Sequence, residues 1–376
     1  MPPKSLIVTM LVILIATSGC IPGGVNNALD TACDASGCIS LSKFSANIDS
    51  ALQGKVVGYV SLVGSLAIIS KYGQARTAAD APALAWDTDV PMNDASLAKV
   101  LTTIAVLQAL AKHNPVLTIN DKILPYLPPD WQANKGPNID TITFKDLLTH
   151  SAGFRVDGNG SHTTYDVLQQ QMTTGVNLSN KTPSYNNLNF AIFRVIIPYL
   201  AGWNDPGPAT RATASANFYI NYMRQNVFQP VGVSDADCKP AANSHPALSY
   251  PPPPVGAAHG IDWGDWTLSC GGGGWVLTAN DLYKVMLDLT GGHTLLSDAQ
   301  KTLMNSNCLG WDCSVRTETD FVGKNGNLVG GGTALWTFYG IFKGSVPVVV
   351  MVNSDPHADI HDIVANAFVD AAVPHP

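Results

Sequence analysis

The sequence contains few charged residues and no basic cluster. Asp, Glu, Lys and Arg together make up only 13% of its 376 residues, and 28 acidic against 21 basic side chains leave a formal net charge of −7. A protein that binds nucleic acid needs a basic face toward the phosphates, so the composition argues against a nucleic-acid partner. With 46% hydrophobic residues, the chain can instead bury a sizeable core, as a soluble globular protein does.

Long apolar runs are also scarce, and the one at the N-terminus is short. "MPPKSLIVTMLVILIATSGC" has a positive charge at Lys4, an apolar run over residues 6–16 and small residues before Cys20. A transmembrane helix needs about 20 apolar residues to cross about 30 Å of hydrocarbon, so we interpret residues 1–19 as an export signal. "TSGC" resembles a bacterial lipobox, although Thr17 stands where leucine is usual. The resemblance implies that Cys20 is lipidated and anchors the mature protein to the membrane of the cell envelope.

The seven cysteines fit an exported protein. Assigning Cys20 to the lipid leaves six, and the segments "CDASGC" and "CLGWDC" each close a very short loop. The simplest pairing joins Cys33 to Cys38, Cys238 to Cys270 and Cys308 to Cys313. Stable disulfides predict an oxidising compartment. A zinc site is the alternative, but it prefers two-residue spacings and nearby histidines, and neither short loop offers them.

Sequence patterns predict strands at both ends of the chain and helices between them. Residues 55–71 are rich in Val, Ile and Gly, which favours paired strands, and strands are expected again at "TALWTFYGIF" and "VPVVVMVN". Residues 96–112 repeat apolar side chains at helical spacing without Gly or Pro, which indicates a long, buried helix with Asp94 as its cap. A final helix is expected in "DIHDIVANAFVDAA".

The composition changes in the middle of the chain. Residues 120–267 are rich in Pro, Asn, Thr and Gly, with short helical pieces such as "TFKDLLTH" and "ANFYINYMRQNVF". We therefore predict an α+β fold, in which an antiparallel sheet flanked by helices is interrupted by a helix-and-loop insert. The expected divisions are a tether over residues 20–45, an α/β domain over 46–119 and 268–376, and the insert over 120–267.

The tetrad Ser-x-x-Lys occurs twice, at Ser96 and Lys99 and at Ser40 and Lys43. Residues three apart share a helical face and lie close enough to hydrogen bond. Ser96 opens the buried helix, where backbone N–H groups and the positive end of the helix dipole can stabilise an oxyanion. Burial would lower the pKa of Lys99, so that its neutral amine can accept the serine proton. Ser96 is therefore the candidate nucleophile and Lys99 the candidate base.

Around this tetrad the chain resembles the serine β-lactamase and penicillin-binding-protein superfamily, in its class C β-lactamase and carboxylesterase branch. The resemblance runs over residues 55–353 and includes, in order, "DLLTHSAGF", "PSYNNLNFAIF", "VFQPVGVSDA", "GGGGWVLTANDL" and "GKNGNLVGG". It implies a β-lactamase/transpeptidase-like fold and an acyl-enzyme mechanism that needs no metal and no cofactor.

The Tyr-x-Asn motif of that superfamily falls on Tyr185 and Asn187. The resemblance implies that Tyr185 takes part in proton transfer and that Asn187 donates to the acyl chain of the substrate. A second copy, at Tyr219 and Asn221, lies in an amphipathic helical stretch, where a tyrosine of the core or surface is more typical. Tyr185 instead follows Thr-Pro-Ser in a loop, the setting in which catalytic side chains concentrate.

The Lys-Thr-Gly motif of the superfamily meets Lys324, Asn325 and Gly326. The resemblance implies that Lys324 adds positive potential and that Gly326 lets substrate approach a strand edge. It further implies an oxyanion hole formed by the N–H groups of Ser96 and Asn327. Asn325 replaces the threonine, which puts in doubt the recognition of the carboxylate of β-lactams and D-Ala-D-Ala peptides. A similar "KYG" at Lys71 precedes the serine and is explained by a strand turn.

Three other groups of residues have structural interpretations. "THSAG" lacks the first glycine of the Gly-x-Ser-x-Gly elbow and follows a helix, which favours a structural role for His150 and Ser151. "HADIH" has helical metal spacing but lacks the glutamate of His-Glu-x-x-His and a third ligand, which favours a solvated helix face. Trp263 and Trp266 in "DWGDWTL" either line an acyl pocket or cover the insert, and the sequence leaves this open.

The function expected from these patterns is that of an exported serine hydrolase that forms an acyl-enzyme on Ser96 with a small-molecule acyl substrate. Hydrolysis of esters or amides, of the carboxylesterase type, is favoured. A β-lactamase or a D-Ala-D-Ala carboxypeptidase is the alternative within the same chemistry. A catalytically silent binding lipoprotein of the cell envelope is the alternative of another class, against which the intact Ser96, Lys99 and Tyr185 argue.

Overall fold

A six-stranded sheet forms the centre of the molecule. The computed structural model describes residues 30–374, except residue 36 and residues 157–162 and 314–320. The strand order is β5-β4-β3-β10-β9-β8, and every neighbouring pair is antiparallel. The strands are β3 (Gly58–Val63), β4 (Ile68–Arg76), β5 (Leu84–Ala85), β8 (Val322–Gly330), β9 (Thr333–Phe342) and β10 (Val346–Val352). The prediction of an antiparallel sheet built from both ends of the chain is confirmed.

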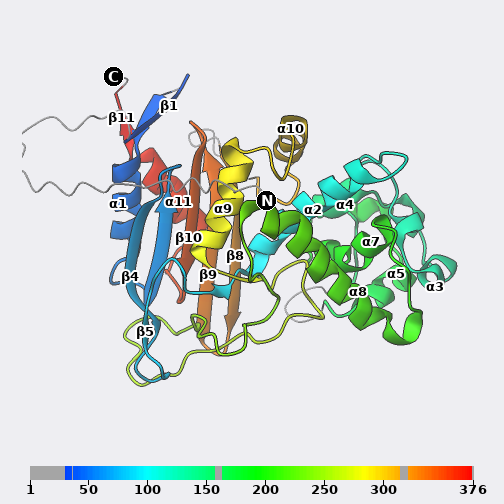
Figure 1. Ribbon diagram of the computed structural model, residues 1–376, viewed down its shortest axis with the longest axis horizontal. Coiled ribbons are helices and arrows are strands. Elements are labelled where there is room, and N and C mark those ends of the chain that lie inside the picture. Colours follow the sequence, from blue (N-terminus) through cyan, green and yellow to red (C-terminus); the bar gives the residue numbers. More distant parts are fainter. Residues whose placement is uncertain (1–29, 36, 157–162, 314–320, 375–376) are drawn as a thin grey trace, which may run out of the picture.

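Helices cover both faces of this sheet (Figure 1). Successive side chains of a strand point to opposite faces. Val348, Val350 and Val352 of β10 accordingly pack with α1 (Leu41–Leu52) and α11 (Ile360–Val369). Val349 and Met351 pack on the opposite face, in the core that contains α9 (Ala279–Gly291) and α2 (Ala98–Lys112). Because both faces are covered, β10 is apolar along its whole length.

The predicted central helix is α2, and every residue from Ala98 to Leu110 is buried. Among the described residues, Ala95–Lys112 is the one helical segment long and apolar enough to cross a membrane, but 83% of it is buried inside the protein. The expectation that Asp94 caps this helix is wrong. Asp94 has helical rather than extended backbone angles, and its carboxylate accepts the N–H of Trp275. Ala95–Leu97 form a short 3-10 turn, η2, between Asp94 and α2.

A group of helices lies beside the sheet, on the right in Figure 1. It contains α3 (Pro129–Ala133), α4 (Phe144–Leu148), α5 (Tyr165–Thr174), α6 (Leu188–Ala191), α7 (Phe193–Leu200) and α8 (Pro208–Met223). Shorter turns are η3 (Leu124–Tyr126), η4 (Ile139–Thr141), η5 (Leu178–Asn180), the π-helical η6 (Arg224–Phe228) and η7 (Gln229–Val231). The last part of the predicted insert, over residues 238–267, is not helical. The N–H groups of Leu248 and Tyr250 donate to Ala75 and Asn353, so this part of the chain returns to the sheet.

The expected tether over residues 20–45 is wrong for the part that the structure describes. β1 (Thr31–Asp34), β2 (Gly37–Ser40) and β11 (Ala372–Val373) form a small antiparallel sheet, and α1 begins directly after it. Ser40 caps α1, because its hydroxyl accepts the backbone N–H of Lys43. The first Ser-x-x-Lys tetrad is therefore a helix cap. The predicted signal at residues 1–19 and the lipidation of Cys20 lie outside the described residues.

The remaining elements are β6 (Met92–Asn93), β7 (Val276–Leu277) and α10 (Asp298–Ser306). The predicted disulfide pairing is confirmed. The three bonds join Cys33 to Cys38, Cys238 to Cys270 and Cys308 to Cys313. The third bond closes the segment of residues 308–313 after α10, and Asp312 in this segment borders the candidate active site.

Candidate active site

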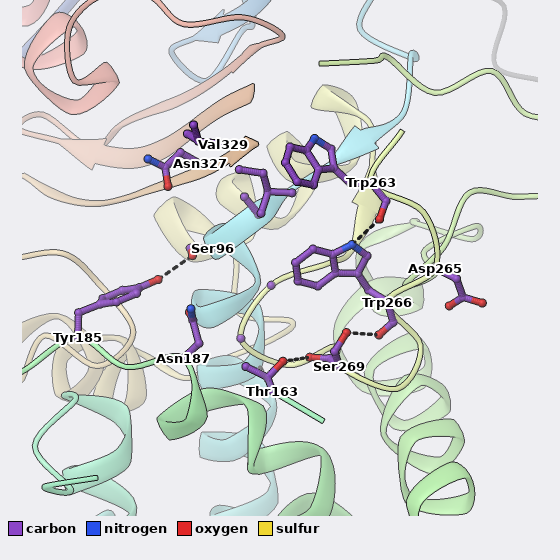
Figure 2. Close-up of a pocket in the computed structure, with 14 residues that line it drawn as sticks. Ser96, Thr163, Tyr185, Asn187, Trp263, Asp265, Trp266, Ser269, Asn327 and Val329 are labelled. Carbon is purple, nitrogen blue, oxygen red and sulfur yellow. Dashed lines mark hydrogen bonds between the residues drawn. The ribbon is translucent and has the colours of Figure 1, made fainter. Parts of the chain in front are cut away.

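Ser96 lies in η2, where the chain turns into α2 (Figure 2). Ala95, directly before it, has a backbone φ of 51°, a value that residues other than glycine rarely adopt. Gly326 of β8 lies against this turn, since a Cβ on Gly326 would come within 2.7 Å of the Ser96 backbone nitrogen. Only glycine lets the strand approach the serine so closely.

Lys99 is fully buried one turn further along α2. Its Nζ lies 3.0 Å from Ser96 Oγ and 2.8 Å from Asn187 Oδ1, and it also donates to the carbonyl of Gly272. Burial lowers the pKa of Lys99 to about 7, although the charges of Asp312 and Asp94 oppose the shift. A neutral amine has two N–H donors and one lone pair. It can therefore donate to Asn187 and Gly272 and still accept the proton of Ser96.

Tyr185 reaches Ser96 from the loop before α6, and its hydroxyl lies 2.7 Å from Ser96 Oγ. Its ring lies close to two lysine side-chain nitrogens, with Lys99 Nζ 4.8 Å and Lys324 Nζ 5.1 Å from the ring centroid. Desolvation of the hydroxyl raises the pKa of Tyr185, and the charge of Lys324 opposes this. The side chain is 49% exposed overall, so solvent moderates the rise. The phenol is protonated at neutral pH and can donate a proton.

His150 supports the loop that holds Tyr185. The two rings lie 4.5 Å apart, and the backbone N–H of Asn186 donates to His150 Nδ1. Burial, reinforced by the charges of Lys99 and Lys324, lowers the pKa of His150 to about 2. The ring is therefore neutral, which fits the predicted structural role. Ser151 bonds within its own turn, to Thr149.

β8 turns its outer edge toward the site, because it is the last strand of the six-stranded sheet. The carbonyl of Gly323 accepts from the backbone N–H of Asp312, and the N–H of Asn325 donates to the Asp312 carboxylate. Both groups point away from β9. Alternate residues of a strand share an edge, so the N–H of Asn327 points the same way, toward the cavity that Asn327 lines with Ser96.

Lys324 does not offer a free positive charge. Its side chain is 2% exposed, and its Nζ lies 2.5 Å from Asp312 Oδ1. The side-chain amide of Asn325 points to the carboxylate of Asp359, at 3.1 and 3.4 Å. Sequence reasoning missed both aspartates. The "CLGWDC" loop indicated a disulfide, but nothing in its spacing indicated that Asp312 pairs with a lysine of β8.

Two cavities meet at Ser96 and Tyr185. The larger, of about 710 Å³, is lined by Trp263, Trp266, Leu328 and Val329 and by polar side chains that include Asn187 (Figure 2). Trp263 and Trp266, whose role the sequence left open, both line this cavity. The smaller cavity, of about 340 Å³, contains Lys324 and Asn325 and is bordered by Asp312, Asp359, His361 and Asp362.

The other motif copies lie apart from Ser96. Tyr219 is buried in α8 and bonds to Thr102, and Lys71 forms an exposed ion pair with Asp87. In the described part of the chain, no group of three or more His, Cys, Asp or Glu side chains is arranged to hold a metal. His361 was expected on a solvated helix face, but it is largely buried and borders the smaller cavity.

Comparisons with known proteins agree with this geometry. The family model for beta-lactamases matches residues 52–371. A curated relative is the "Putative penicillin-binding protein PbpX" of Bacillus subtilis (strain 168), which is 29% identical over 140 residues. The match covers 37% of this chain and only 30% of that relative's length.

Solved structures share the fold over most of both chains. The beta-lactamase/D-alanine carboxypeptidase from Pseudomonas syringae is 14% identical, with a TM-score of 0.65, covering 88% of this chain and 97% of that one. The D-amino acid amidase from Ochrobactrum anthropi SV3, solved with D-phenylalanine, is 16% identical, with a TM-score of 0.65 and coverages of 87% and 98%. At such identities the likeness concerns the fold, and it confirms the predicted fold class.

Proposed function

From the premise that this chain belongs to the beta-lactamase family, we propose that it hydrolyses an ester or amide through an acyl-enzyme on Ser96. Family membership supports a hydrolase, and one observation supports this mechanism. Two groups able to move a proton converge on the same oxygen, because Lys99 Nζ lies 3.0 Å and Tyr185 Oη 2.7 Å from Ser96 Oγ. Both distances are within hydrogen-bond reach of a serine to be activated.

Acylation begins when the neutral amine of Lys99 accepts the proton of Ser96 and Oγ attacks the carbonyl carbon of the substrate. The carbonyl oxygen gains negative charge and is stabilised by the N–H groups of Ser96 and Asn327. A donor in such a position contributes on the order of 3 kcal/mol to transition-state stabilisation. The C–O or C–N bond then breaks, Tyr185 gives its proton to the departing atom, and Lys99 reprotonates Tyr185.

Deacylation uses the same groups in reverse. A water molecule loses a proton to the neutral amine of Lys99 and attacks the acyl carbon, and this proton then passes to Ser96 Oγ as the acid product departs. The buried Lys99 is suited to both directions, because a pKa of about 7 lets it accept and release a proton near neutral pH.

We favour esters over β-lactams as substrates. The motif lysine Lys324 is paired with Asp312, and Asn325 stands where β-lactam-recognising relatives carry a hydroxyl and donates to Asp359. Neither group is free to anchor a substrate carboxylate. Activated esters need only the nucleophile, the oxyanion hole and a cavity with apolar walls for the acyl chain, and Trp263, Trp266 and Leu328 supply apolar parts of the wall of the larger cavity. The natural acyl substrate is thus a small molecule without a required carboxylate.

Covalent labelling tests the mechanism. A fluorophosphonate probe reacts only with an activated serine, so the wild-type protein should gain one adduct on the peptide that contains Ser96. Ser96→Ala should remain unlabelled, and Ser151→Ala should label as the wild type does, because Ser151 bonds only to its own turn. An unlabelled wild-type protein with an intact fold would favour the silent binding lipoprotein instead. A fluorescent penicillin that labels more readily than the fluorophosphonate would favour a penicillin-recognising enzyme.

We also propose that the protein is exported and held at the cell envelope through Cys20. Three disulfides support an oxidising compartment. Intact-mass analysis of the protein from a bacterial host tests this proposal. The mature chain should begin at a lipid-modified Cys20 and show no free thiol after denaturation without reductant. A chain that still carries Met1, or six thiols that can be alkylated, would contradict it.

A further inference from the structure

The ammonium group of Lys324 is balanced inside the protein. Its Nζ lies 2.5 Å from Asp312 Oδ1, and the other oxygen of Asp312 accepts the N–H of Asn325 at 3.2 Å. The Lys324 side chain is 2% exposed, whereas that of Asp312 is 33% exposed. A substrate that enters the smaller cavity therefore meets the carboxylate more readily than the ammonium group.

The position of Asp312 is fixed by its own loop. The backbone N–H of Asp312 donates to the carbonyl of Gly323, so the loop adds to the edge of β8. The Cys308–Cys313 disulfide closes the loop, and the indole of the neighbouring Trp311 donates to Asn305 of α10. These contacts hold Asp312 in place beside Lys324.

Other carboxylates near Lys324 also disfavour a negatively charged substrate group. Asp359 and Asp362 also line the smaller cavity, so three carboxylates and the ammonium group of Lys324 surround it. The imidazole of His361 lies there as well, with its Nδ1 3.8 Å from Asp362. A substrate carboxylate placed beside β8 would be repelled by these carboxylates. A free lysine would attract it, but Lys324 is already paired with Asp312 and offers no net attraction. A neutral or positively charged group meets no such penalty.

The leaving group is the part of the substrate that enters this cavity. Asn187, which the mechanism assigns to the acyl chain, lines the larger cavity with Trp263 and Trp266 but does not line the smaller one. Tyr185, the proton donor to the departing atom, borders both. With its carbonyl on Ser96, a substrate directs its acyl chain into the larger cavity and its leaving group toward Lys324 and Asp312.

We propose that Asp312 is a specificity-determining residue: by neutralising Lys324, it restricts the hydrolase to substrates with a neutral or cationic leaving group. This inference rests on the proposed function, because it concerns the leaving group of the acyl transfer on Ser96. It goes beyond that function in stating the charge of the substrate and the residue that selects it.

Three butyrate esters with matched phenols test the proposal. They are 3-(butyryloxy)benzamide, 3-(butyryloxy)benzoate and 3-(butyryloxy)-N,N,N-trimethylanilinium, which place a neutral, an anionic and a cationic group at the same point of the leaving group. The measured quantity is kcat/KM for each ester relative to the amide. Comparing this ratio between protein variants cancels the intrinsic reactivity of each ester.

The wild-type protein should hydrolyse the anionic ester least efficiently. In Asp312→Asn the ratio of anionic to neutral ester should rise on the order of tenfold, the size expected when one charge a few ångströms away is removed at a partly solvated site. Asp298→Asn is the control. It removes the same charge from a side chain that is 81% exposed on α10, and it should leave all three values unchanged. An unchanged or lower ratio in active Asp312→Asn would overturn the proposal.

A second variant decides the matter if Asp312→Asn does not fold. Asp359→Asn removes a charge from the same cavity, and asparagine can still cap α11 as Asp359 does. It should raise the anionic ratio in the same direction, and a ratio within twofold of the wild type would count against the inference. The proposed function fails separately. If Ser96→Ala hydrolyses these esters as the wild type does, the mechanism is wrong, whereas Ser96-dependent hydrolysis without charge selection removes only the role of Asp312.

Discussion

The two Ser-x-x-Lys tetrads have the same spacing and different surroundings. In the first, Ser40 caps α1 and Lys43 is exposed, so the serine hydroxyl serves the backbone N–H of Lys43. In the second, Ser96 stands in a turn below β8, and Lys99 is fully buried beneath it. The difference teaches that the spacing brings serine and lysine onto one face, whereas burial decides whether the lysine can act as a base.

Burial also explains why the second tetrad costs stability. A buried ammonium group loses its hydration, and Lys99 recovers part of this through Ser96, Asn187 and Gly272. The Ser40 cap has the opposite effect, because a serine cap stabilises a helix by about 1 kcal/mol. The same four-residue pattern thus caps a helix in one region and, in the proposed mechanism, supplies the nucleophile and the base in the other.

The largest expected effect separates the two serines. Ser96→Ala should lower kcat for p-nitrophenyl butyrate on the order of a million-fold, because the nucleophile is lost. Ser40→Ala should keep its turnover and lose about 1 kcal/mol of unfolding free energy, because only a cap is removed. Steady-state kinetics and denaturant unfolding of both variants check this. A large loss of turnover in Ser40→Ala would break the comparison.

The next effect concerns the partners of Ser96. Lys99→Ala and Tyr185→Phe should each lower kcat by about 10³- to 10⁴-fold, in the upper range for a proton-transfer group. The double variant should be little worse than either, because the two side chains serve one proton-transfer unit. Lys43→Ala is the matched control and should leave kcat unchanged. Strictly additive losses would show that Lys99 and Tyr185 act independently.

The pH dependence should follow the buried lysine. With a pKa of about 7, Lys99 is protonated and inactive below that pH, so kcat/KM should rise as pH increases through about 7. The unfolded chain holds this proton up to the ordinary lysine pKa near 10.4. Between these values the unfolded state binds more protons, so the stability of the wild type should rise with pH relative to Lys99→Met. A flat difference across this window would show that Lys99 is not depressed.

The smallest expected effect lies at β8. Asn325→Thr introduces the hydroxyl that β-lactam-recognising relatives carry, so kcat/KM for a cephalosporin should rise, by up to about tenfold. The value for p-nitrophenyl butyrate should change little, because that ester has no carboxylate. Measuring both substrates on both proteins checks the ordering. A wild-type preference for the cephalosporin would reverse it.

Much of the fold followed from local pattern. The strands at both ends, the buried helix of residues 96–112 and the two short disulfides appear as predicted, because apolar periodicity and short cysteine spacing act within a few residues. The Cys238–Cys270 bond spans 32 residues and was predicted only because the other cysteines were already paired. The small sheet that replaces the predicted tether was missed because β1 and β2 are short and only partly buried. The pairing of β2 with β11 joins segments from opposite parts of the chain, and no local pattern reports such a contact.

The sequence by itself determined the positions of the motif residues Ser96, Lys99, Tyr185 and Lys324, because side-chain type, spacing and order can be read directly along the chain. Only the tertiary structure decided what surrounds them. The fold buries Lys99 against the carbonyl of Gly272, and it brings Asp312, from a disulfide loop, onto Lys324. It also places Trp263 and Trp266 in the wall of the cavity that Ser96 lines. A pKa, a neutralised charge and a cavity wall each depend on groups that are distant in sequence, and folding alone places those groups within a few ångströms of each other.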